Sequence, residues 1–311
     1  AGWLALCTAA PAVLARWRPW ARRVVFAGAA AGLGGLLVYL ALLASPAGRA
    51  ALAGGPAYAD NLSGWNEIAA AVQADLAGLP PGTVPVADNF MLGAQLSLAL
   101  GDGEVRVLEH PLNAKHGRAL QLRHWGLLES GQAFRAGRPV LLVVEDTARP
   151  LKDRLAGYRA LCELTGGLPP PRVLNVDRGR KRFLRFVLPA DAGAGVDGCT
   201  LPALAWIETP RPGDTVSGGL RVEGWALKSG AGLARVEVLL DGEVVAVARH
   251  GLPRPDVAVY WGLPPGDGDA FGFSAELPLD GRAPGRAWLG LRLHGRDGSI
   301  EDWPAMPVRL R

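Results

Sequence analysis

Residues 83–110, "TVPVADNFMLGAQLSLALGDGEVRVLEH", carry the clearest pattern of secondary structure in the chain. Its first six residues predict a short extended segment. Residues 89–100 follow a helical apolar pattern, and residues 104–109 have the alternation of a strand. Further along, "RPVLLVVED" (138–146) is a continuous apolar run, as is typical of a buried strand. Because strands alternate with helices, this part of the chain is predicted to be an α/β layered domain.

Flanking segments extend this domain. "NLSGWNEIAAAVQADLAGLP" (61–80) places its apolar residues at helical spacing, and "ALQLRHWGLLES" (119–130) favours another helix. "RVLNVDRGRKRFLRFVLP" (172–189) predicts a hairpin that turns at residues 177–180. We therefore expect the α/β domain to cover residues 47–190.

A change of pattern follows the small-residue segment "ADAGAGVDGCTLP", in which residues 191–202 are expected to form a linker. Beyond it come short runs with strand patterning, including "LARVEVLL" (233–240) and "EVVAVAR" (243–249). The Asp241-Gly242 dipeptide between them is a strong signal for a two-residue type I′ hairpin, which requires positive φ. Regularly spaced strands and turns predict an all-β immunoglobulin-like sandwich over residues 203–311.

The beginning of the chain has the pattern of membrane helices. "VVFAGAAAGLGGLLVYLALLAS" (24–45) carries no charged side chain over 22 positions, long enough to span a bilayer. Residues 1–15 form a second apolar run, cut short at the start of the chain, so we expect the C-terminal part of a longer protein. Four arginines in "RWRPWARR" (16–23) predict a cytoplasmic loop. Residues 1–46 would then end a transmembrane domain, and residues 46–311 would lie outside the cytoplasm.

Charge and cysteine content narrow the function classes. The net charge is +4 over 311 residues, without the concentrated basic surface of a nucleic-acid binder, so no nucleic-acid partner is expected. The three cysteines include no CxxC pair, which argues against structural zinc. Cys7 lies in an apolar run. Cys162 and Cys199 lie in the part of the chain that is expected outside the cytoplasm, where thiols oxidise. We predict a disulfide between them; the alternative is two separate buried thiols.

Cationic and hydrogen-bonding residues concentrate in "LEHPLNAKHGRALQLRHWG", residues 108–126, which hold three of the five histidines. The strand is expected to end before Pro111, and residues 112–117 to form a loop that leads into the next helix. Ligands in α/β sheets bind outside the carboxyl ends of the strands, and cationic side chains there attract phosphate. The candidate substrate- or phosphate-binding residues are Lys115, His116 and Arg118, with His110 and Asn113 as neighbours that set the shape. The alternative is a solvated loop without a specific role.

A metal site is not expected in this segment. His110, His116 and His124 are spaced by six and eight residues, which matches no common ligand pattern. Asp88, with Asn89, begins a predicted helix and is interpreted as its N-cap rather than as a catalytic acid.

Two blocks, "ADNFMLGAQLSLAL" (87–100) and "VLEHPLNAKHGRALQLRHWG" (107–126), resemble bacterial membrane glycosyltransferases with the GT-C fold. These are the ArnT-like, dolichyl-phosphate-mannose-protein mannosyltransferase-like enzymes of the bacterial inner membrane. The resemblance implies transfer of a sugar from a polyprenyl-phosphate donor to an envelope acceptor outside the cytoplasm. The family's catalytic aspartate lies in the first external loop, to which no residue here corresponds. We therefore expect no catalytic acid or base in this chain, no evident cofactor, and any divalent cation in the missing membrane half.

The last domain resembles immunoglobulin-like modules of bacterial envelope proteins through "RVEGWAL", "RVEVLLDGEVV", "GLPRPDV" and "FGFSAEL". Packing or spacing is the expected role of this domain, with carbohydrate contact as the alternative. Two other functions stay open for the chain: a membrane-tethered, non-catalytic envelope or carbohydrate-binding protein, and a structural subunit of an envelope assembly.

Overall fold

The structure is a computed structural model that describes the chain apart from residues 1, 102–104, 131–136, 191–197, 264–269 and 280, and apart from the side chains of residues 2–6. The chain divides into two compact units, residues 1–59 and residues 60–311, which are described separately.

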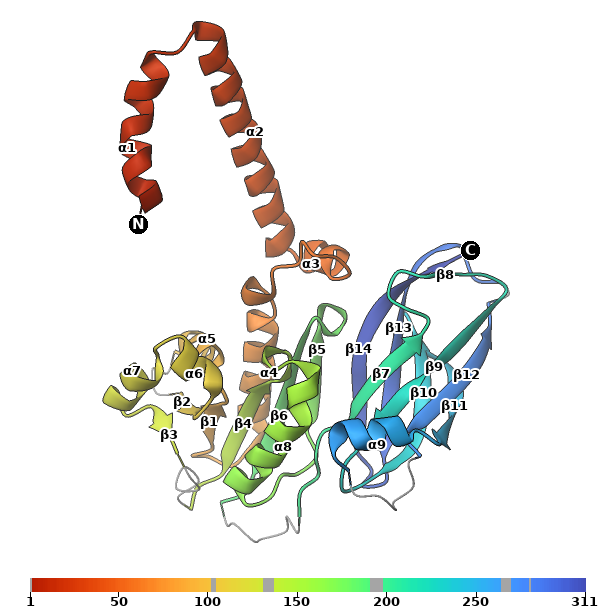
Figure 1. The fold of residues 1–311 in the computed structure, drawn as a ribbon. Coiled ribbons are helices and arrows are strands. Elements are labelled where there is room, and N and C mark those ends of the chain that lie inside the picture. The colour runs from red at the N-terminus through yellow and green to blue at the C-terminus, as the bar shows by residue number, and fades with distance from the viewer. Residues whose placement is uncertain (1, 102–104, 131–136, 191–197, 264–269, 280) are drawn as a thin grey trace. The chain divides into compact units, whose positions relative to one another are not determined.

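The first unit consists of three helices, α1 (Gly2–Ala15), α2 (Pro19–Ala44) and α3 (Pro46–Leu52) (Figure 1). Helix α2 has 26 residues and a mean hydropathy of 2.0, so it is long and apolar enough to cross a bilayer, as a membrane anchor or a signal sequence would be. It starts earlier than predicted because Pro19 occupies the first turn, where its missing N–H costs nothing. The predicted arginine loop is therefore reduced to a short turn at residues 16–18.

The second unit begins with a six-stranded sheet of order β3-β2-β1-β4-β6-β5. Its strands are β1 (Val84–Ala87), β2 (Arg106–Leu108), β3 (Leu128–Glu129), β4 (Val140–Glu145), β5 (Arg172–Val176) and β6 (Lys181–Leu188). Strands β1 to β4 run parallel, whereas β6 and β5 form the antiparallel hairpin predicted for residues 172–189. The connecting helices are η1 (Asp60–Leu62), α4 (Trp65–Gly78), α5 (Phe90–Leu100), α6 (Pro111–Lys115), α7 (Ala119–His124), η3 (Asp146–Ala148), α8 (Leu151–Thr165) and η4 (Asp177–Gly179). The predicted α/β layering is thereby confirmed.

Helices cover both faces of this sheet. Helices α4 and α5 bury Ile68 and Leu92 against one face, where Phe183 also lies. Helix α8 buries Leu155 and Tyr158 against the other face (Figure 1). Burying these apolar side chains from both directions explains why β4 is buried at every position.

Two local predictions were wrong, and one helix was missed. The helix expected over residues 119–130 ends at His124, because Gly126 adopts a left-handed φ of 68° and residues 128–129 turn into β3. The loop expected at 112–117 begins with the short helix α6. Helix α8 was not predicted at all.

The rest of the second unit is a β-sandwich, as expected for this part of the chain. Its strands are β7 (Leu204–Thr209), β8 (Thr215–Val216), β9 (Gly219–Leu227), β10 (Leu233–Leu240), β11 (Glu243–Leu252), β12 (Gly272–Pro278), β13 (Gly285–Gly295) and β14 (Ile300–Leu310), with helix α9 (Pro255–Trp261) after β11. The order is β7-β9-β12-β11-β10-β13-β14-β8. Strand β11 pairs first with β10 and then with β12, so it passes from one layer to the other. The predicted hairpin turn is confirmed, with φ of 54° at Asp241 and 93° at Gly242.

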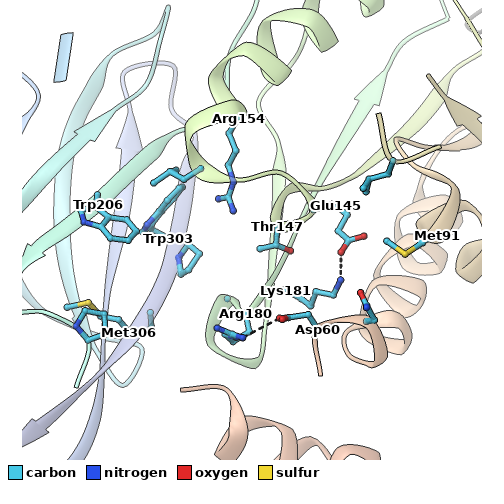
Figure 2. A pocket seen from close by; sticks show the side chains of 18 of the residues that line it. Asp60, Met91, Glu145, Thr147, Arg154, Arg180, Lys181, Trp206, Trp303 and Met306 are labelled. Atoms are coloured by element: carbon cyan, nitrogen blue, oxygen red, sulfur yellow. Dashed lines mark hydrogen bonds and ion pairs between the residues drawn. The ribbon is translucent and has the colours of Figure 1, made fainter. Parts of the chain in front are cut away.

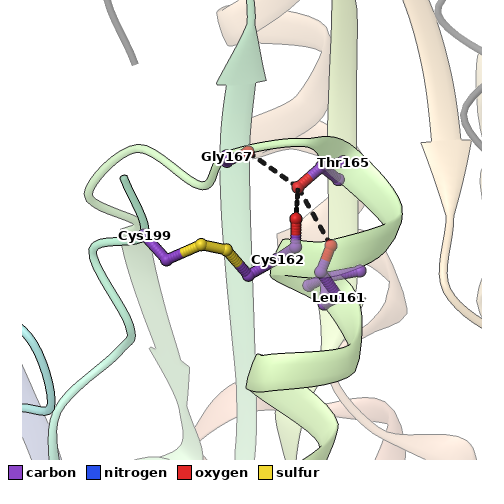
Figure 3. The surroundings of a disulfide bond; sticks show 5 residues. All are labelled: Leu161, Cys162, Thr165, Gly167 and Cys199. Atoms are coloured by element: carbon purple, nitrogen blue, oxygen red, sulfur yellow. Dashed lines mark hydrogen bonds between the residues drawn. A yellow bond between two sulfur atoms is a disulfide. The ribbon is translucent and has the colours of Figure 1, made fainter. Parts of the chain in front are cut away.

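The segment between the sheet and the sandwich is held in place at its end. Residues 191–197 of the predicted linker lie outside the described part of the chain. Cys199 forms a disulfide with Cys162 of α8, with Cα atoms 6.0 Å apart (Figure 3). The Thr200 amide donates to the Leu168 carbonyl at 2.8 Å. The structure thus contains the disulfide that the sequence favours, and residues 199–202 are not a loose linker.

A buried ionic network joins the sheet to the sandwich. Arg182 of β6 is fully buried and donates to Asp146 at 2.9 Å and to Glu301 of β14 at 3.1 Å. Lys228, directly after β9, donates to Glu301 at 2.6 Å, and the Ala203 amide donates to the same carboxylate. One hydrophobic core also runs from the α8 face of the sheet into the sandwich. The sheet and the sandwich are therefore parts of a single packed body.

Candidate functional site

The candidate site lies at the carboxyl edge of the parallel strands. Strands β1 and β4 are neighbours, but the chain leaves β1 toward β2 and β3 and leaves β4 toward the hairpin on the other side. Such a change of direction opens a crevice outside the strand ends, where ligands of open α/β sheets usually bind. Asp88 follows β1, His110 follows β2 and Glu145 ends β4, so three titratable side chains meet at this edge.

Asp88 is buried at this edge. Its Oδ1 accepts hydrogen bonds from Asn89 Nδ2 at 2.9 Å and from the Glu145 amide at 3.2 Å. Its Oδ2 has no hydrogen-bond partner among the described residues and lies 3.8 Å from His110 Nε2. Burial raises the pKa of Asp88 to about 7. Asp88 is not the helix N-cap, because Asn89 holds that position and accepts from the amides of the first turn of α5.

His110 is also buried, and it caps α6. Its Nδ1 accepts from the Leu112 amide at 3.1 Å, so the neutral ring carries its proton on Nε2, the nitrogen that faces Asp88. Burial, and secondarily the positive charge of Arg149, lowers the pKa of His110 to about 4. His110 is therefore neutral at neutral pH and does not act as a phosphate-binding cation.

Asn113 fixes the shape of the segment. Its Oδ1 accepts from the Phe90 amide at 2.9 Å, and its Nδ2 donates to the Leu108 carbonyl at 2.9 Å. The side chain is buried, so it ties α6 to the end of β2 and the start of α5 and presents no group to a ligand.

A cavity of about 630 Å³ opens beside this edge and reaches the sandwich (Figure 2). Its cationic lining side chains are Arg154, Arg180 and Lys181, and its carboxylates are Asp60 and Glu145. Lys181 is paired with Glu145, and Arg180 lies 3.5 Å from Asp60. Arg154 is paired with Asp146 at 2.9 Å, so each of the three cations already has a carboxylate partner. The cavity is therefore rich in charged hydrogen-bonding groups and suits a strongly polar ligand.

The sandwich supplies the apolar wall of this cavity. Trp206 of β7 and Trp303 of β14 face it, with Met306 beside them (Figure 2). Trp206 is 49% exposed, and its ring is free to be covered by a ligand, whereas Trp303 is buried under the guanidinium groups of Arg182 and Arg154. An apolar wall opposite polar and charged groups is the usual composition of a small-molecule site.

The structure separates the cations predicted from the sequence. His116 lines the cavity, and its ring lies 5.6 Å from that of Phe90. Arg118 donates to Gln121 at 2.9 Å and lines a second cavity, of about 800 Å³, between α5 and α7. Lys115 is exposed and lines neither. Three titratable side chains arranged to hold a metal ion are not found among the described residues, so the three histidines of this segment do not converge.

Sequence reasoning missed the residues that contribute most to the cavity. Arg180 and Lys181 lie in "DRGRKR" (177–182), which was interpreted as a hairpin turn without regard to its charge. The cluster of four basic residues in six was the available signal. Trp206 and Trp303 lie on strands that were not predicted, and nothing local marks them.

Comparisons with known proteins do not assign a family. No family model matches the sequence, and no curated protein is significantly similar to it. Among solved structures, fibronectin(III)-like modules of CbhA from Clostridium thermocellum align at 18% identity over 34% of this chain and 94% of theirs, with a TM-score of 0.23. CopC from Methylosinus trichosporium OB3b aligns at 15% identity over 34% and 93%, with a TM-score of 0.21. An endo-beta-1,4-mannanase from Thermotoga petrophila aligns at 12% identity over 79% and 62%, with a TM-score of 0.26. At such scores these likenesses carry no functional argument.

Proposed function

We propose that the chain is the C-terminal portion of an integral-membrane glycosyltransferase that moves a sugar from a polyprenyl-phosphate donor to an extracytoplasmic acceptor. The observation that carries the proposal is the cavity at the carboxyl edge of the sheet, which combines an exposed tryptophan with charged hydrogen-bond donors. The long apolar helix α2 and the two sequence blocks that resemble this class of enzyme also support it. In this proposal residues 46–311 lie outside the cytoplasm.

The cavity suits one sugar unit and its anionic substituent. The apolar face of a pyranose ring would pack on the exposed ring of Trp206. Arg180 and Lys181 lie on the opposite side and carry N–H donors for hydroxyl or phosphate oxygens (Figure 2). His116 adds a further polar group at the α6 end. This assignment keeps His116 from the predicted substrate-side set and adds the two cations of the hairpin.

In this proposal the carboxylates that line the cavity have no catalytic role. Glu145 is held by Lys181, and Asp60 lies beside Arg180, so each already has a cationic partner. Asp88 is buried and does not line the cavity. By resemblance to the family, an acceptor nucleophile displaces the lipid phosphate directly, and the cations of this chain stabilise the phosphate charge that develops. The general base would come from the family's first external loop.

The pairing of both carboxylates also favours a second candidate, a membrane-tethered carbohydrate-binding protein without catalytic activity. It would use the same cavity, with Trp206 and Arg180 as its recognition groups. The two candidates differ in whether a bound donor is consumed.

Sugar transfer in membranes that contain the complete protein tests the proposal. With an isotopically labelled polyprenyl-phosphate sugar, Arg180→Ala is expected to lower transfer about tenfold or more, because a charge-assisted hydrogen bond is lost. Arg159→Ala is the matched control, an exposed arginine of α8 that lies outside the cavity, and it should retain transfer. Equal activity of both variants would refute the role of the cavity. Donor binding without any transfer by the unaltered protein would favour the non-catalytic candidate.

A further inference from the structure

A second surface of the molecule combines exposed large apolar side chains with unpaired cations. Helices α5, α6 and α7 lie together next to β2 and β3 (Figure 1). We propose that their outer surface, here called the α5–α7 surface, docks onto anionic phospholipids of the bilayer that holds the chain. The surface is formed by Leu98, Lys115, Arg118, Leu120, Arg123 and Trp125, all of them exposed.

The apolar part of this surface is unusually exposed. Leu98 is 81% exposed, Leu120 73% and Trp125 58%. Between α5 and α7 lies the cavity of about 800 Å³, whose apolar lining residues include Phe90 and Leu122. Isolated exposed leucines need no explanation, but these three large side chains lie on or next to the helices that flank the cavity, and Trp125 lines it, which marks an interaction site.

The charged part of this surface is one-sided. Residues 110–128 contain no aspartate or glutamate, and Lys115, Arg118 and Arg123 lie within them. Among the described residues none of these three cations forms an ion pair. Arg118 donates a hydrogen bond to the Gln121 side chain, which is neutral. By contrast Arg106, which also lines the groove, is neutralised by Glu129. The positive charge of the surface is thus available to an anionic partner.

An anionic phospholipid matches both properties at once. Its phosphate complements Arg118 and Arg123, and the first part of its acyl chain fits the groove between α5 and α7. Tryptophan favours the boundary between headgroups and hydrocarbon, which suits the half-exposed Trp125. Each basic residue near an anionic bilayer surface adds to this attraction. The inference rests on the proposed function in one respect, that α2 places the chain at a bilayer.

Fluorescence of a label at the surface tests this docking. The full chain, with Cys7→Ser, is placed in nanodiscs of anionic or zwitterionic lipid, and Leu120→Cys is labelled with an environment-sensitive dye. In anionic discs we expect quenching by lipid-borne quenchers and protection from iodide; in zwitterionic discs we expect the reverse. Arg118→Gln with Arg123→Gln should lower the docked population about tenfold or more, from the loss of two basic contacts. The matched control is Val259→Cys on α9, an 81% exposed apolar site of the sandwich, which should stay accessible to iodide.

The possible outcomes separate docking from membrane anchoring. Iodide access at Leu120→Cys in both lipids would overturn the docking proposal, and so would equal lipid quenching at Leu120→Cys and Val259→Cys. A label at Leu36→Cys on α2 reports insertion independently. If this label is not quenched by lipid, the membrane anchor of the proposed function fails, and the Leu120→Cys signal is then read with anionic vesicles added from outside.

Discussion

At the scale of single residues, Asp88 and His110 form the most unusual pair in the molecule. Both are buried, each has a polar atom without a hydrogen-bond partner among the described residues, and these two atoms lie 3.8 Å apart. Burial pushes their pKa values in opposite directions, to about 7 for Asp88 and about 4 for His110. Both groups are thereby driven toward their neutral forms, which a water-poor environment favours.

Because the pKa values of Asp88 and His110 shift in opposite directions, their effects on the free energy of unfolding have opposite dependence on pH. The folded-state pKa of Asp88 is raised above 3.8, so its contribution is present below pH 3.8 and is lost as pH rises toward 7. The folded-state pKa of His110 is lowered from 6.5, so its contribution is present above pH 6.5 and is lost as pH falls toward 4. Between pH 4 and 6.5 the two slopes should cancel.

With Asp88→Asn, only His110 of this pair should contribute to the pH dependence of stability. The free energy of unfolding should then rise with pH between 4 and 6.5, by up to about 1.4 kcal/mol per pH unit, whereas His110→Gln should make it fall with pH. Denaturant titrations at several pH values measure both slopes. Parallel curves for the unaltered chain and both variants would contradict this account.

At the scale of elements, the sequence predicted those whose pattern is local. The β1–α5–β2 unit, the β5–β6 hairpin and the Asp241-Gly242 turn all carry periodicity or turn chemistry within a few residues. Helix α7 was predicted too long because "ALQLRHWGLLES" keeps a helical pattern beyond Gly126, and the pairing of β3 with β2 overrides that pattern. Strand pairing between distant segments has no signature within a short window.

The residues of the candidate site also fall into a group that is local in sequence and a group that is not. The segment around His116 was found because its cations and histidines are close in sequence. Trp206, Arg180 and Glu145 come from three distant strands or turns, and only the folded chain brings them to one cavity. The two predicted neighbours, His110 and Asn113, form hydrogen bonds with backbone groups of this segment, and their role beside a substrate stays a prediction.

Helix α5 approaches β2 closely at a glycine, and a substitution there tests the packing of this element. A Cβ at Gly93 would lie 2.5 Å from Val107 Cγ2, so Gly93→Ala should destabilise the chain by about 1–3 kcal/mol. The matched control is Gly78→Ala in α4, where a Cβ meets nothing within 4 Å, so stability should stay equal or rise by up to about 1 kcal/mol. Thermal unfolding in mild detergent measures both. Equal melting temperatures would mean that α5 does not pack this closely.

At the scale of the whole molecule, the ionic network makes the sandwich a wall of the cavity rather than a spacer. Burial opposes the charge of Arg182, but Asp146, Tyr158 and Glu301 more than offset it, so the pKa of Arg182 is raised. Asn175 Nδ2 also donates to the Asp302 carbonyl at 2.7 Å, and Gly179 packs directly against Pro304. The sheet and the sandwich therefore fix the distance between the hairpin cations and the tryptophans.

Removing the charge of Glu301 should weaken this junction strongly. Glu301→Gln leaves Arg182 and Lys228 buried with too little negative charge, which typically costs about 3–5 kcal/mol. Glu208→Gln, which breaks an exposed pair with Arg254, should cost less than about 1 kcal/mol. Denaturant unfolding followed by tryptophan fluorescence distinguishes them. A similar small effect for both would show that the network does not hold the two layers together.

In the proposed function, a sugar linked to a lipid phosphate binds between the exposed ring of Trp206 and the cations of the hairpin. Calorimetric titration of the chain in detergent with a short-chain polyprenyl-phosphate sugar tests it most directly. We expect saturable binding that Trp206→Ala weakens about tenfold or more, because the apolar contact with the sugar ring is lost, while Trp20→Ala leaves the affinity unchanged. Absence of binding, or equal affinity of both variants, would contradict it.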